Sequence, residues 1–407
     1  MDQDTQADIC IVGAGPVGGV LACRLAEAGL SVVVIDRVAL SPMEHPAFDG
    51  RAYAIAAGSR RLLGDAGLWP ALAASSCPIH DIRVTDGRIG QPASRLFLHF
   101  DHFETEAREP FGWMVEARAL RIALNAALNR LSNIEVFAPA DAIVTRTQAG
   151  AEVKIAGGPT IACQLVIAAE GRNSPLREAA GIAVTRMGYD QTGMVFAIGH
   201  SLPHNNVALE HFLPSGPFAQ LPMAASADAE IGGVEHVSAV VWTERTETAK
   251  RILALDDARL AREIGRRLGP HLGTVRPLGR RWSYLLSAMH AHHYIDTRLA
   301  VVGDAAHGIH PIAGQGLNLG FRDVIALSDR LIAAHTAKQD LGGAAVLASY
   351  QRARRGANLT MLAATDGLDR LFSSNNPVLR AARDIGIGAV HRLPRLKRAF
   401  MRQAMGS

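Results

Sequence analysis

The chain has 407 residues, of which 48% are hydrophobic and 20% are charged. This composition excludes a disordered or low-complexity chain and is typical of globular proteins that bury a large core. At about 150 residues per domain, the length predicts two or three domains. The formal net charge of +4 is too small to predict nucleic-acid binding without a concentrated basic patch.

Cysteine spacing and hydropathy indicate an intracellular protein without a metal site. The four cysteines have neither zinc-ligand spacing nor the pattern of a disulfide framework, so we expect reduced, buried thiols. No apolar run reaches the length of a membrane-spanning helix, and the opening residues are acidic, unlike a secretory signal. We therefore expect a cytoplasmic protein that spans no membrane.

The first elements along the chain predict a parallel βαβ unit. Two apolar runs, at residues 9–12 and 32–35, flank a glycine turn and a helical pattern. Continuous hydrophobic strands of this kind are typical of a sheet that is covered on both faces. A doubly wound α/β sheet is therefore expected from the start of the chain.

The glycine turn, Gly13-Ala14-Gly15-Pro16-Val17-Gly18, matches the GxGxxG pattern of dinucleotide-binding proteins. Gly13 permits a tight turn, Gly15 lets the backbone approach a pyrophosphate, and Gly18 lets the helix pack closely on the strand. The helix N-terminus adds partial positive charge. Asp36, which ends the second apolar run, can accept hydrogen bonds from ribose hydroxyls. The motif does not distinguish FAD from NAD, since both contain adenosine diphosphate.

Farther along the chain the pattern changes. Residues 51–74 and 117–131 are spaced as amphipathic helices. Residues 193–243 contain short alternating or apolar stretches separated by Pro, Gly and Asn, which predict an antiparallel sheet in a second domain. Two short apolar runs, 164–169 and 298–302, are each followed by a glycine beside an acidic residue and are expected to rejoin the first sheet.

The second glycine-rich motif, GDAAHGIHPIAGQGLNLG at residues 303–320, follows the last of these runs. The Asp304 carboxylate could hold a polyhydroxyl chain. The Gly314-Gln315-Gly316 turn would present backbone NH groups and a helix N-terminus to an electron-rich ring. A helix start of this kind stabilises the negative charge of a reduced flavin. Two such motifs on one sheet imply FAD in an extended conformation.

Together these motifs resemble the FAD-dependent aromatic hydroxylases, the class A flavoprotein monooxygenases. The resemblance is strongest to the branch that hydroxylates polyprenyl phenols in ubiquinone biosynthesis, of the 2-octaprenyl-6-methoxyphenol hydroxylase type. It covers nearly the whole chain. Shorter matching pieces are Arg51-Ala52, Val115-Glu116-Ala117-Arg118, Glu170-Gly171 with Ser174 and Arg177, Gly216-Pro217 with Leu221-Pro222, and Thr365-Asp366-Gly367-Leu368 with Leu371-Phe372.

We accordingly expect an α/β fold with a doubly wound, Rossmann-like FAD-binding domain, an inserted and mainly antiparallel β-sheet domain for substrate, and C-terminal helices. The expected segments are 1–75, 104–180 and 276–345 for the FAD-binding domain, 76–103 and 181–275 for the substrate domain, and 346–407 for the C-terminal helical region.

The resemblance implies roles for particular residues at the cofactor. Arg51 and Arg118 would contact the FAD phosphates or ribityl chain, and Asp304 the ribityl hydroxyls. The isoalloxazine ring would be contacted by Pro311, Gly314, Gly316, Leu317 and Asn318. Glu170 stands where the family usually has Asp, a position associated with the nicotinamide cofactor as well as FAD, so the choice between NADPH and NADH stays open. The complete set expected at the cofactor is Gly13, Gly15, Pro16, Gly18, Asp36, Arg37, Arg51, Arg118, Glu170, Asp304, Pro311, Gly314, Gln315, Gly316, Leu317 and Asn318.

The resemblance also implies a reaction. A hydride from NADPH or NADH reduces the flavin, dioxygen adds to give a C4a-hydroperoxide, and this delivers an electrophilic oxygen to an electron-rich ring. Water must be excluded, because hydrogen peroxide is otherwise released before transfer. The catalytic side chain is unknown; His307 is a candidate, although buried histidines more often have structural roles. The substrate pocket is expected to be roofed by Gly216, Pro217, Phe218, Leu221 and Pro222.

The C-terminal segment is basic and amphipathic. Such a segment can lie on the anionic inner face of the plasma membrane, which would suit a substrate with a long isoprenoid tail. The alternative is a packed helix whose outer face is merely charged. The basic residues are Arg380, Arg383, Arg392, Arg395, Lys397, Arg398 and Arg402, against the single acid Asp384.

We therefore predict an FAD-dependent monooxygenase that uses NAD(P)H and dioxygen to hydroxylate a polyprenylated phenol in ubiquinone biosynthesis. Membrane contact and a complex of ubiquinone-biosynthesis proteins would suit such a substrate. Three alternatives stay open: hydroxylation of another small phenol, a flavin reductase of the same fold, and a non-redox module that binds prenyl lipids. The residues do not specify the ring carbon, the tail length or the oligomeric state.

Overall fold

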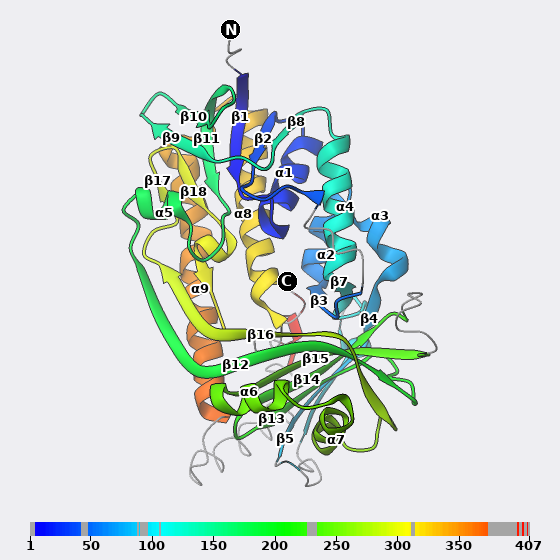
Figure 1. Cartoon of the computed structure of the whole chain (residues 1–407). Coiled ribbons are helices and arrows are strands. Elements are labelled where there is room, and N and C mark those ends of the chain that lie inside the picture. Colours follow the sequence, from blue (N-terminus) through cyan, green and yellow to red (C-terminus); the bar gives the residue numbers. More distant parts are fainter. Residues whose placement is uncertain are drawn as a thin grey trace.

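The computed structural model describes residues 5–41, 48–87, 89, 97–105, 107–225, 234–310, 314–372, 397–398, 401–402 and 405. Within these residues the chain forms two eight-stranded sheets and one three-stranded sheet. Figure 1 shows the first eight-stranded sheet with its helices in the upper half of the molecule and the second in the lower half. The expected α/β fold class is confirmed.

The first sheet has parallel central strands in the order β18-β11-β1-β2-β8. All four residues of β2 are buried, which explains its unbroken hydrophobic run. Helices α1, α4 and α8 pack beside these strands (Figure 1). The bounds are β1 Thr5–Val12, α1 Pro16–Glu27, β2 Val32–Ile35, α4 Ala117–Arg130, β8 Ile134–Phe137, β9 Ala142–Arg146, β10 Ala151–Ile155, β11 Thr160–Ala168, α5 Pro175–Ala179, β17 Ile295–Asp296, β18 Leu299–Val301, α8 Gly316–Thr336 and α9 Ala344–Phe372.

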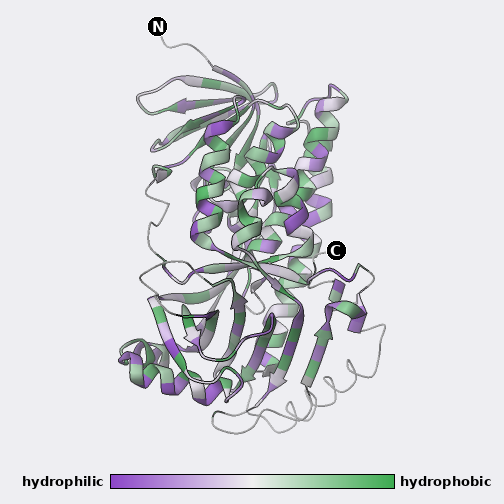
Figure 2. Cartoon of the chain, turned by 90° about the vertical axis from the view of Figure 1, so that its right-hand side faces the viewer, coloured by the Kyte–Doolittle hydropathy of each residue, from purple (hydrophilic) through white to green (hydrophobic). Residues whose placement is uncertain are grey.

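The second sheet has the order β19-β16-β12-β15-β14-β13-β5-β6 and is antiparallel except where β13 pairs with β5. Helices α6 and α7 cover its outer face, and Figure 2 shows them at the lower left with hydrophilic residues on their exposed sides. The bounds are β5 Asp81–Asp86, β6 Phe97–Asp101, β12 Val184–His200, β13 Val207–Leu213, β14 Gly216–Met223, β15 His236–Arg245, α6 Thr246–Leu253, α7 Asp257–Leu268, β16 Val275–Ala291 and β19 His307–Gly308.

A small three-stranded sheet, β3-β7-β4, lies between the two larger sheets (Figure 1). Its strands are β3 Ala52–Ala56, β7 Gly112–Glu116 and β4 Cys77–Ile79, and α2 Ala57–Asp65 follows β3 directly. The sequence predicts a helix from residue 51, whereas residues 52–56 form a strand. The reason is pairing with β7, a distant segment whose Gly112 lets the backbones approach: a methyl group there would lie 2.4 Å from the carbonyl oxygen of Ile55.

The sequence predicts that the FAD-binding domain resumes at residue 276. In the structure, the chain rejoins the first sheet later than this. Strand β16 pairs with β12 along almost its whole length, from Val275 opposite His200 to Ala291 opposite Val184. Figure 1 shows these two long, curved strands running side by side from the first domain into the second. The chain re-enters the first sheet at β17.

An apolar cluster joins the two domains. It contains Ala57 at the start of α2, Met114 from the small sheet, and Ala197 and Ala239 from the second sheet. We call it the interdomain cluster. Its other buried members are Phe48, Cys77, Ile79, Phe100, Phe111, Ala208, Met223, Val237, Leu278, Met401 and Met405, and Ala52, Ala54, Ile82, Val84, Leu98, Trp113, Leu221, Ala224 and Val234 are partly buried against it.

The described part of the C-terminal segment packs into this cluster. Met401 and Met405 are buried, and the Lys397 ammonium lies 2.6 Å from a carboxylate oxygen of Glu104. Of the other basic residues expected there, those from Arg380 to Arg395 lie outside the described residues. Over the described ranges, no helix combines the length and hydropathy that crossing a membrane requires.

The core of the second domain depends on Trp242. Its ring is fully buried, 5.5 Å from the ring of Phe218 and 4.0 Å from the guanidinium carbon of Arg267. We expect Trp242→Ala to lower the free energy of unfolding by about 3–5 kcal/mol, because it removes a large buried side chain. Chemical denaturation followed by circular dichroism measures this change. The control is Phe103→Ala, which truncates an exposed side chain and should change the free energy of unfolding by less than about 0.5 kcal/mol. Equal losses of stability in the two variants would contradict the prediction.

Candidate cofactor and substrate site

The turn between β1 and α1 requires glycine at two positions. Gly13 has a φ of +110°, and a methyl group added there would lie 2.4 Å from the carbonyl oxygen of Ala169. A methyl group on Gly18 would lie 2.0 Å from the carbonyl oxygen of Gly13. Helix α1 and strand β11 therefore approach as closely as their backbones allow. Pro16 opens the helix, at a position that lacks a hydrogen-bond acceptor in any case.

The loop after β2 is tied to this turn. One carboxylate oxygen of Asp36 accepts a hydrogen bond from the Ala14 NH at 2.7 Å, and the other accepts one from the Val38 NH at 2.9 Å. Arg37 is exposed beside it. The Arg121 guanidinium on α4 donates to the Ala14 carbonyl at 2.7 Å. Sequence reasoning missed Arg121, because no local pattern connects position 121 with the glycine turn.

The second motif starts at the end of β18. Gly303 adopts a φ of +58° and begins a short 3₁₀ turn over Gly303–Ala305. The Asp304 side chain is 53% exposed and forms an ion pair with Arg172, Nε to carboxylate oxygen 3.2 Å. An exposed pair of this kind is weak, so the carboxylate can also accept hydrogen bonds from a bound polyol. Arg172 was not singled out from the sequence.

Hydrogen bonds of Asn318 connect the start of α8 with strand β3 of the small sheet and with helix α2. Its Oδ1 accepts from the Ala56 NH at 2.9 Å and the Ser59 hydroxyl at 2.8 Å, and its Nδ2 donates to the Ala54 carbonyl at 2.8 Å. Asn318 therefore holds the wall of the expected ring site in addition to any contact with the ring. Gly314, Gln315, Gly316 and Leu317 precede it as a turn and the first residues of the helix, and Pro311 lies outside the described residues.

The two glycine motifs touch each other at Val17. A methyl group added to Gly303 would lie 3.1 Å from the Val17 side chain, and one added to Gly320 would lie 2.7 Å from it. The N-terminal ends of α1 and α8 therefore lie together, although they are distant in the sequence. This is the arrangement that an extended dinucleotide would require.

Among the described residues, the starts of both helices are open. The N-cap residues of α1 and α8 make no side-chain cap hydrogen bond, and a methyl group added to Gly15 or Gly316 would meet no described atom within 4 Å beyond its own helix and its chain neighbours. Backbone NH groups at such a helix N-terminus bind anions, because the helix dipole adds partial positive charge. The residues therefore fit FAD: the start of α1 would hold its pyrophosphate, and the start of α8 would face the pyrimidine edge of its ring.

A buried polar network connects the second glycine-rich motif to helices α8 and α9. Asp323 on α8 accepts hydrogen bonds from the Gly303 NH at 3.1 Å and from Arg354 Nε at 2.8 Å, and its Oδ2 lies 2.5 Å from His307 Nε2. Burial alone would raise the pKa of Asp323, yet His307 and Arg354 hold it below its ordinary value. His307, the candidate catalytic residue, is itself buried within this network, which indicates a structural role.

The two arginines expected at the cofactor lie on neighbouring elements. Arg51 forms an ion pair with Asp49 at 2.7 Å, and its guanidinium carbon lies 4.2 Å from the ring centroid of Trp282 on β16. Arg118 donates to Glu116 at 3.2 Å. It lies on the same face of α4 as Arg121, one turn earlier, and so beside the glycine turn.

Glu170 follows the end of β11 and lies beside Gly13 of the first glycine turn. Its carboxylate accepts hydrogen bonds from the hydroxyl of Ser174 and, at 3.4 Å, from the Leu176 NH at the start of α5. Burial raises the pKa of Glu170 above its ordinary value, against the opposing effect of these bonds. The carboxylate is thus engaged in local structure.

The residues expected to roof the substrate pocket divide between two faces of the second sheet. Leu221 on β14 packs against the interdomain cluster, on the side of the first domain. Phe218 points the other way, into the core with Trp242 under α6 and α7. Side chains alternate along a strand. Pro217 therefore lies on the same face as Leu221, and Pro222 lies on the same face as Phe218. Gly216 begins the strand, with a φ of +137°.

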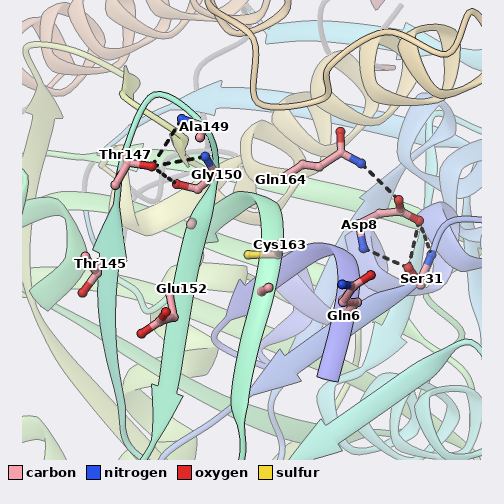
Figure 3. A pocket seen from close by; sticks show the side chains of 13 residues that line it. Gln6, Asp8, Ser31, Thr145, Thr147, Ala149, Gly150, Glu152, Cys163 and Gln164 are labelled. Atoms are coloured by element: carbon pink, nitrogen blue, oxygen red, sulfur yellow. Dashed lines mark hydrogen bonds between the residues drawn. The ribbon is translucent and has the colours of Figure 1, made fainter. Parts of the chain in front are cut away.

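A hollow of about 740 Å³ lies at the opposite end of the first sheet, far from both motifs. Figure 3 shows that its polar side chains bond to one another: Gln164 donates to Asp8 at 3.3 Å, and Ser31 donates to Asp8 at 2.8 Å. Parallel sheets bind their ligands at the carboxyl ends of the strands, whereas this hollow lies at the amino end of β1. We therefore place the functional site at the glycine turns.

Comparison with known proteins agrees with this geometry. A sequence model of the FAD binding domain family matches residues 6–365. Ubiquinone hydroxylase UbiL of Rhodospirillum rubrum is 48% identical over 405 residues, which are 99% of this chain and 90% of that protein. The 3-demethoxyubiquinol 3-hydroxylase of Escherichia coli is 34% identical, with 98% of each chain covered.

The fold is shared with solved structures of low sequence identity. The crystal structure of p-nitrophenol 4-monooxygenase PnpA from Pseudomonas putida superposes with a TM-score of 0.76 at 18% identity, covering 100% of this chain and 99% of that one. The sequence match spans nearly the whole chain and includes both glycine turns. The chain therefore belongs to the FAD binding domain family and is an FAD-dependent monooxygenase.

Proposed function

We propose that this monooxygenase hydroxylates the aromatic ring of a polyprenylated phenol in ubiquinone biosynthesis, with NAD(P)H as electron donor and dioxygen as co-substrate. The observation that carries the proposal is the contact of the two glycine motifs at Val17, with an apolar interdomain cluster beside it. The names of the related ubiquinone hydroxylases support the substrate class.

The chain's own residues would hold the cofactor at both ends. Gly15 and the first turn of α1 would bind the pyrophosphate, with Asp36 beside the ribose and Asp304 beside the ribityl chain. Gly316 and the first turn of α8 would face the pyrimidine edge of the ring and stabilise negative charge there. When bound, FAD supplies electron transfer and oxygen activation.

The interdomain cluster would exclude water from the reaction. It places Ala54, which contacts the Gly314 turn, in one apolar assembly with Leu221 and Ala239 of the second sheet. Small apolar side chains leave room for a ring while offering no hydrogen bonds to water. A phenol carrying an isoprenoid tail matches this lining better than a charged aromatic acid does.

Peripheral membrane contact is a second part of the proposal. Arg380, Arg383 and Arg392 would bind anionic lipid headgroups and deliver a lipid-soluble substrate. A complex with other ubiquinone-biosynthesis proteins would also help to deliver this substrate. The packing of Met401 and Met405 in the interdomain cluster supports this, since the proposed substrate region includes that cluster.

The first test concerns the pyrophosphate site. Gly15→Leu should weaken FAD binding at least tenfold, because the side chain would occupy open space while the extended backbone, with φ of −62°, accepts any residue. Titration of apoprotein with FAD, followed by flavin fluorescence, measures the dissociation constant. Gly64→Leu adds the same side chain to open space on α2 and should leave the dissociation constant unchanged. Wild-type affinity in Gly15→Leu would refute the placement of the pyrophosphate.

The second test concerns the reaction. A strain lacking this protein should accumulate a prenylated phenol one hydroxylation short of the next quinone intermediate, because ring oxidation is blocked. Mass spectrometry of extracted quinones identifies that precursor. In parallel, purified holoenzyme should oxidise NAD(P)H faster when a phenol is added and incorporate oxygen from O₂ into it. Oxidation without incorporation would indicate a reductase instead, and an unaltered quinone pool would contradict the pathway assignment.

The third test concerns the membrane. Replacing Arg380, Arg383 and Arg392 by Gln should weaken binding to phosphatidylglycerol vesicles by about 1 kcal/mol per arginine, as measured by co-sedimentation, while bound FAD is retained. The control replaces three exposed arginines on the outer helices of the second domain, Arg251, Arg259 and Arg262, and should change binding less. Equal losses would indicate non-specific charge attraction rather than a membrane-binding segment.

A further inference from the structure

Strand β13 carries one carboxylate on an otherwise apolar face. Ala208 packs in the interdomain cluster and Phe212 beside Val84 and Leu98, which are also partly buried against that cluster. Leu213 packs on the opposite side, with the core under α6 and α7. Side chains alternate along a strand. Glu210 therefore shares the face of Ala208 and Phe212, which is turned toward the first domain.

The neighbours of Glu210 across the sheet are hydrophobic. Val84 on β5 and Ala219 on β14 lie directly opposite it in the two flanking strands. Leu221, two residues beyond Ala219 on the same face, belongs to the interdomain cluster. That cluster extends to Ala54, whose Cβ would lie 3.5 Å from a methyl group on Gly314. One apolar assembly thus connects Glu210 with the turn at the start of α8.

Among the described residues, the Glu210 carboxyl has no hydrogen-bond or ion-pair partner. The residue is 9% exposed. Burial raises the pKa of Glu210 to about 7. The outer face of the same strand differs, because His211 is paired there with the hydroxyl of Thr85 at 2.6 Å.

An unpaired buried carboxyl destabilises a fold, because it loses its hydration without gaining a hydrogen bond. A structural explanation would require a donor, as Asp323 has in Gly303, His307 and Arg354. Groups whose environment disfavours their charge are concentrated at functional sites. Glu210 is therefore best explained by a donor that arrives with the substrate.

We propose that Glu210 binds the phenol hydroxyl of the substrate, accepting its hydrogen bond on the inner face of the second sheet. This inference rests on the proposed function and names the residue that recognises the phenol. The hydroxyl is the one strong donor on an otherwise apolar prenylated ring, and the carboxyl is the matching acceptor. Partial transfer of the hydroxyl proton to the carboxylate leaves more electron density on the ring carbons ortho and para to the oxygen. The proton returns when the product leaves.

Selectivity against rings without a hydroxyl follows from this pairing. A methyl ether of the same phenol cannot donate, and its binding would leave the carboxyl buried and unpaired. Sites built around one buried polar group reject analogues that lack the matching group much more strongly than apolar pockets reject a change of size.

The test uses the holoenzyme with 2-prenylphenol and its methyl ether as probes. Glu210→Leu and Glu210→Gln are compared with wild type and with Glu247→Gln, which removes an exposed carboxylate from α6 on the outer face of the same domain. The dissociation constant of each probe is measured from the change in bound-flavin absorbance, and the thermal midpoint and FAD content are measured on the same samples.

We expect Glu210→Leu to weaken 2-prenylphenol binding tenfold to a hundredfold, on the order of a hydrogen bond to a charged group. Its preference for the phenol over the methyl ether should disappear, while its FAD content stays at the wild-type level and its thermal midpoint stays equal or rises. Glu210→Gln, which keeps the shape and one acceptor oxygen, should show an intermediate loss. Glu247→Gln should behave as wild type.

Two outcomes would overturn the inference. Unchanged phenol binding in both Glu210 variants would exclude contact with the hydroxyl. A lowered thermal midpoint in both variants, with phenol preference retained, would assign Glu210 a structural role. Failure of the proposed function is distinguishable from either, because wild-type holoenzyme would then bind neither probe and its NAD(P)H oxidation would not respond to the phenol.

Discussion

The structure depends on close contact between two glycine turns from distant parts of the chain. The Val17 side chain lies against the backbone of Gly303 and Gly320, and within the first turn Gly18 lies against the Gly13 carbonyl. The contact brings the N-terminal ends of α1 and α8 together, and each end carries partial positive charge. In the proposed function, cofactor binding would depend on this backbone geometry, which side chains such as Asn318 and Asp323 maintain.

The second constraint is apolar packing at the junction of the domains. The interdomain cluster is built largely from alanine, methionine and branched aliphatic residues, which pack together without offering hydrogen bonds. Against this background lies the Glu210 carboxyl, which has no partner among the described residues. The same apolar junction also receives Met401 and Met405, so the last part of the chain contributes to the wall between the two domains.

The fold class and the cofactor were predictable because glycine spacing reports directly on backbone geometry, and because buried parallel strands have a recognisable composition. Strand β3 was not predictable, since its short alanine-rich segment is defined by pairing with β7. Arg121, Asn318 and Asp323 act through partners far away in the sequence, and a single sequence does not show such partners. The outward orientation of Phe218 depends on the register of β14, which the local pattern leaves undetermined.

The order of strands in the first sheet has a consequence for biogenesis. Strand β11 lies between β1 and β18, which are among the first and last strands of the chain. During translation, β1 can pair with β11 well before β18 and α8 emerge from the ribosome, whereas all long strands of the second sheet are already available by then. The inserted domain can therefore assemble first, and flavin uptake becomes a late step of maturation. Until that step, the edge of β11 that pairs with β18 stays unpaired, and unpaired apolar strand edges promote aggregation.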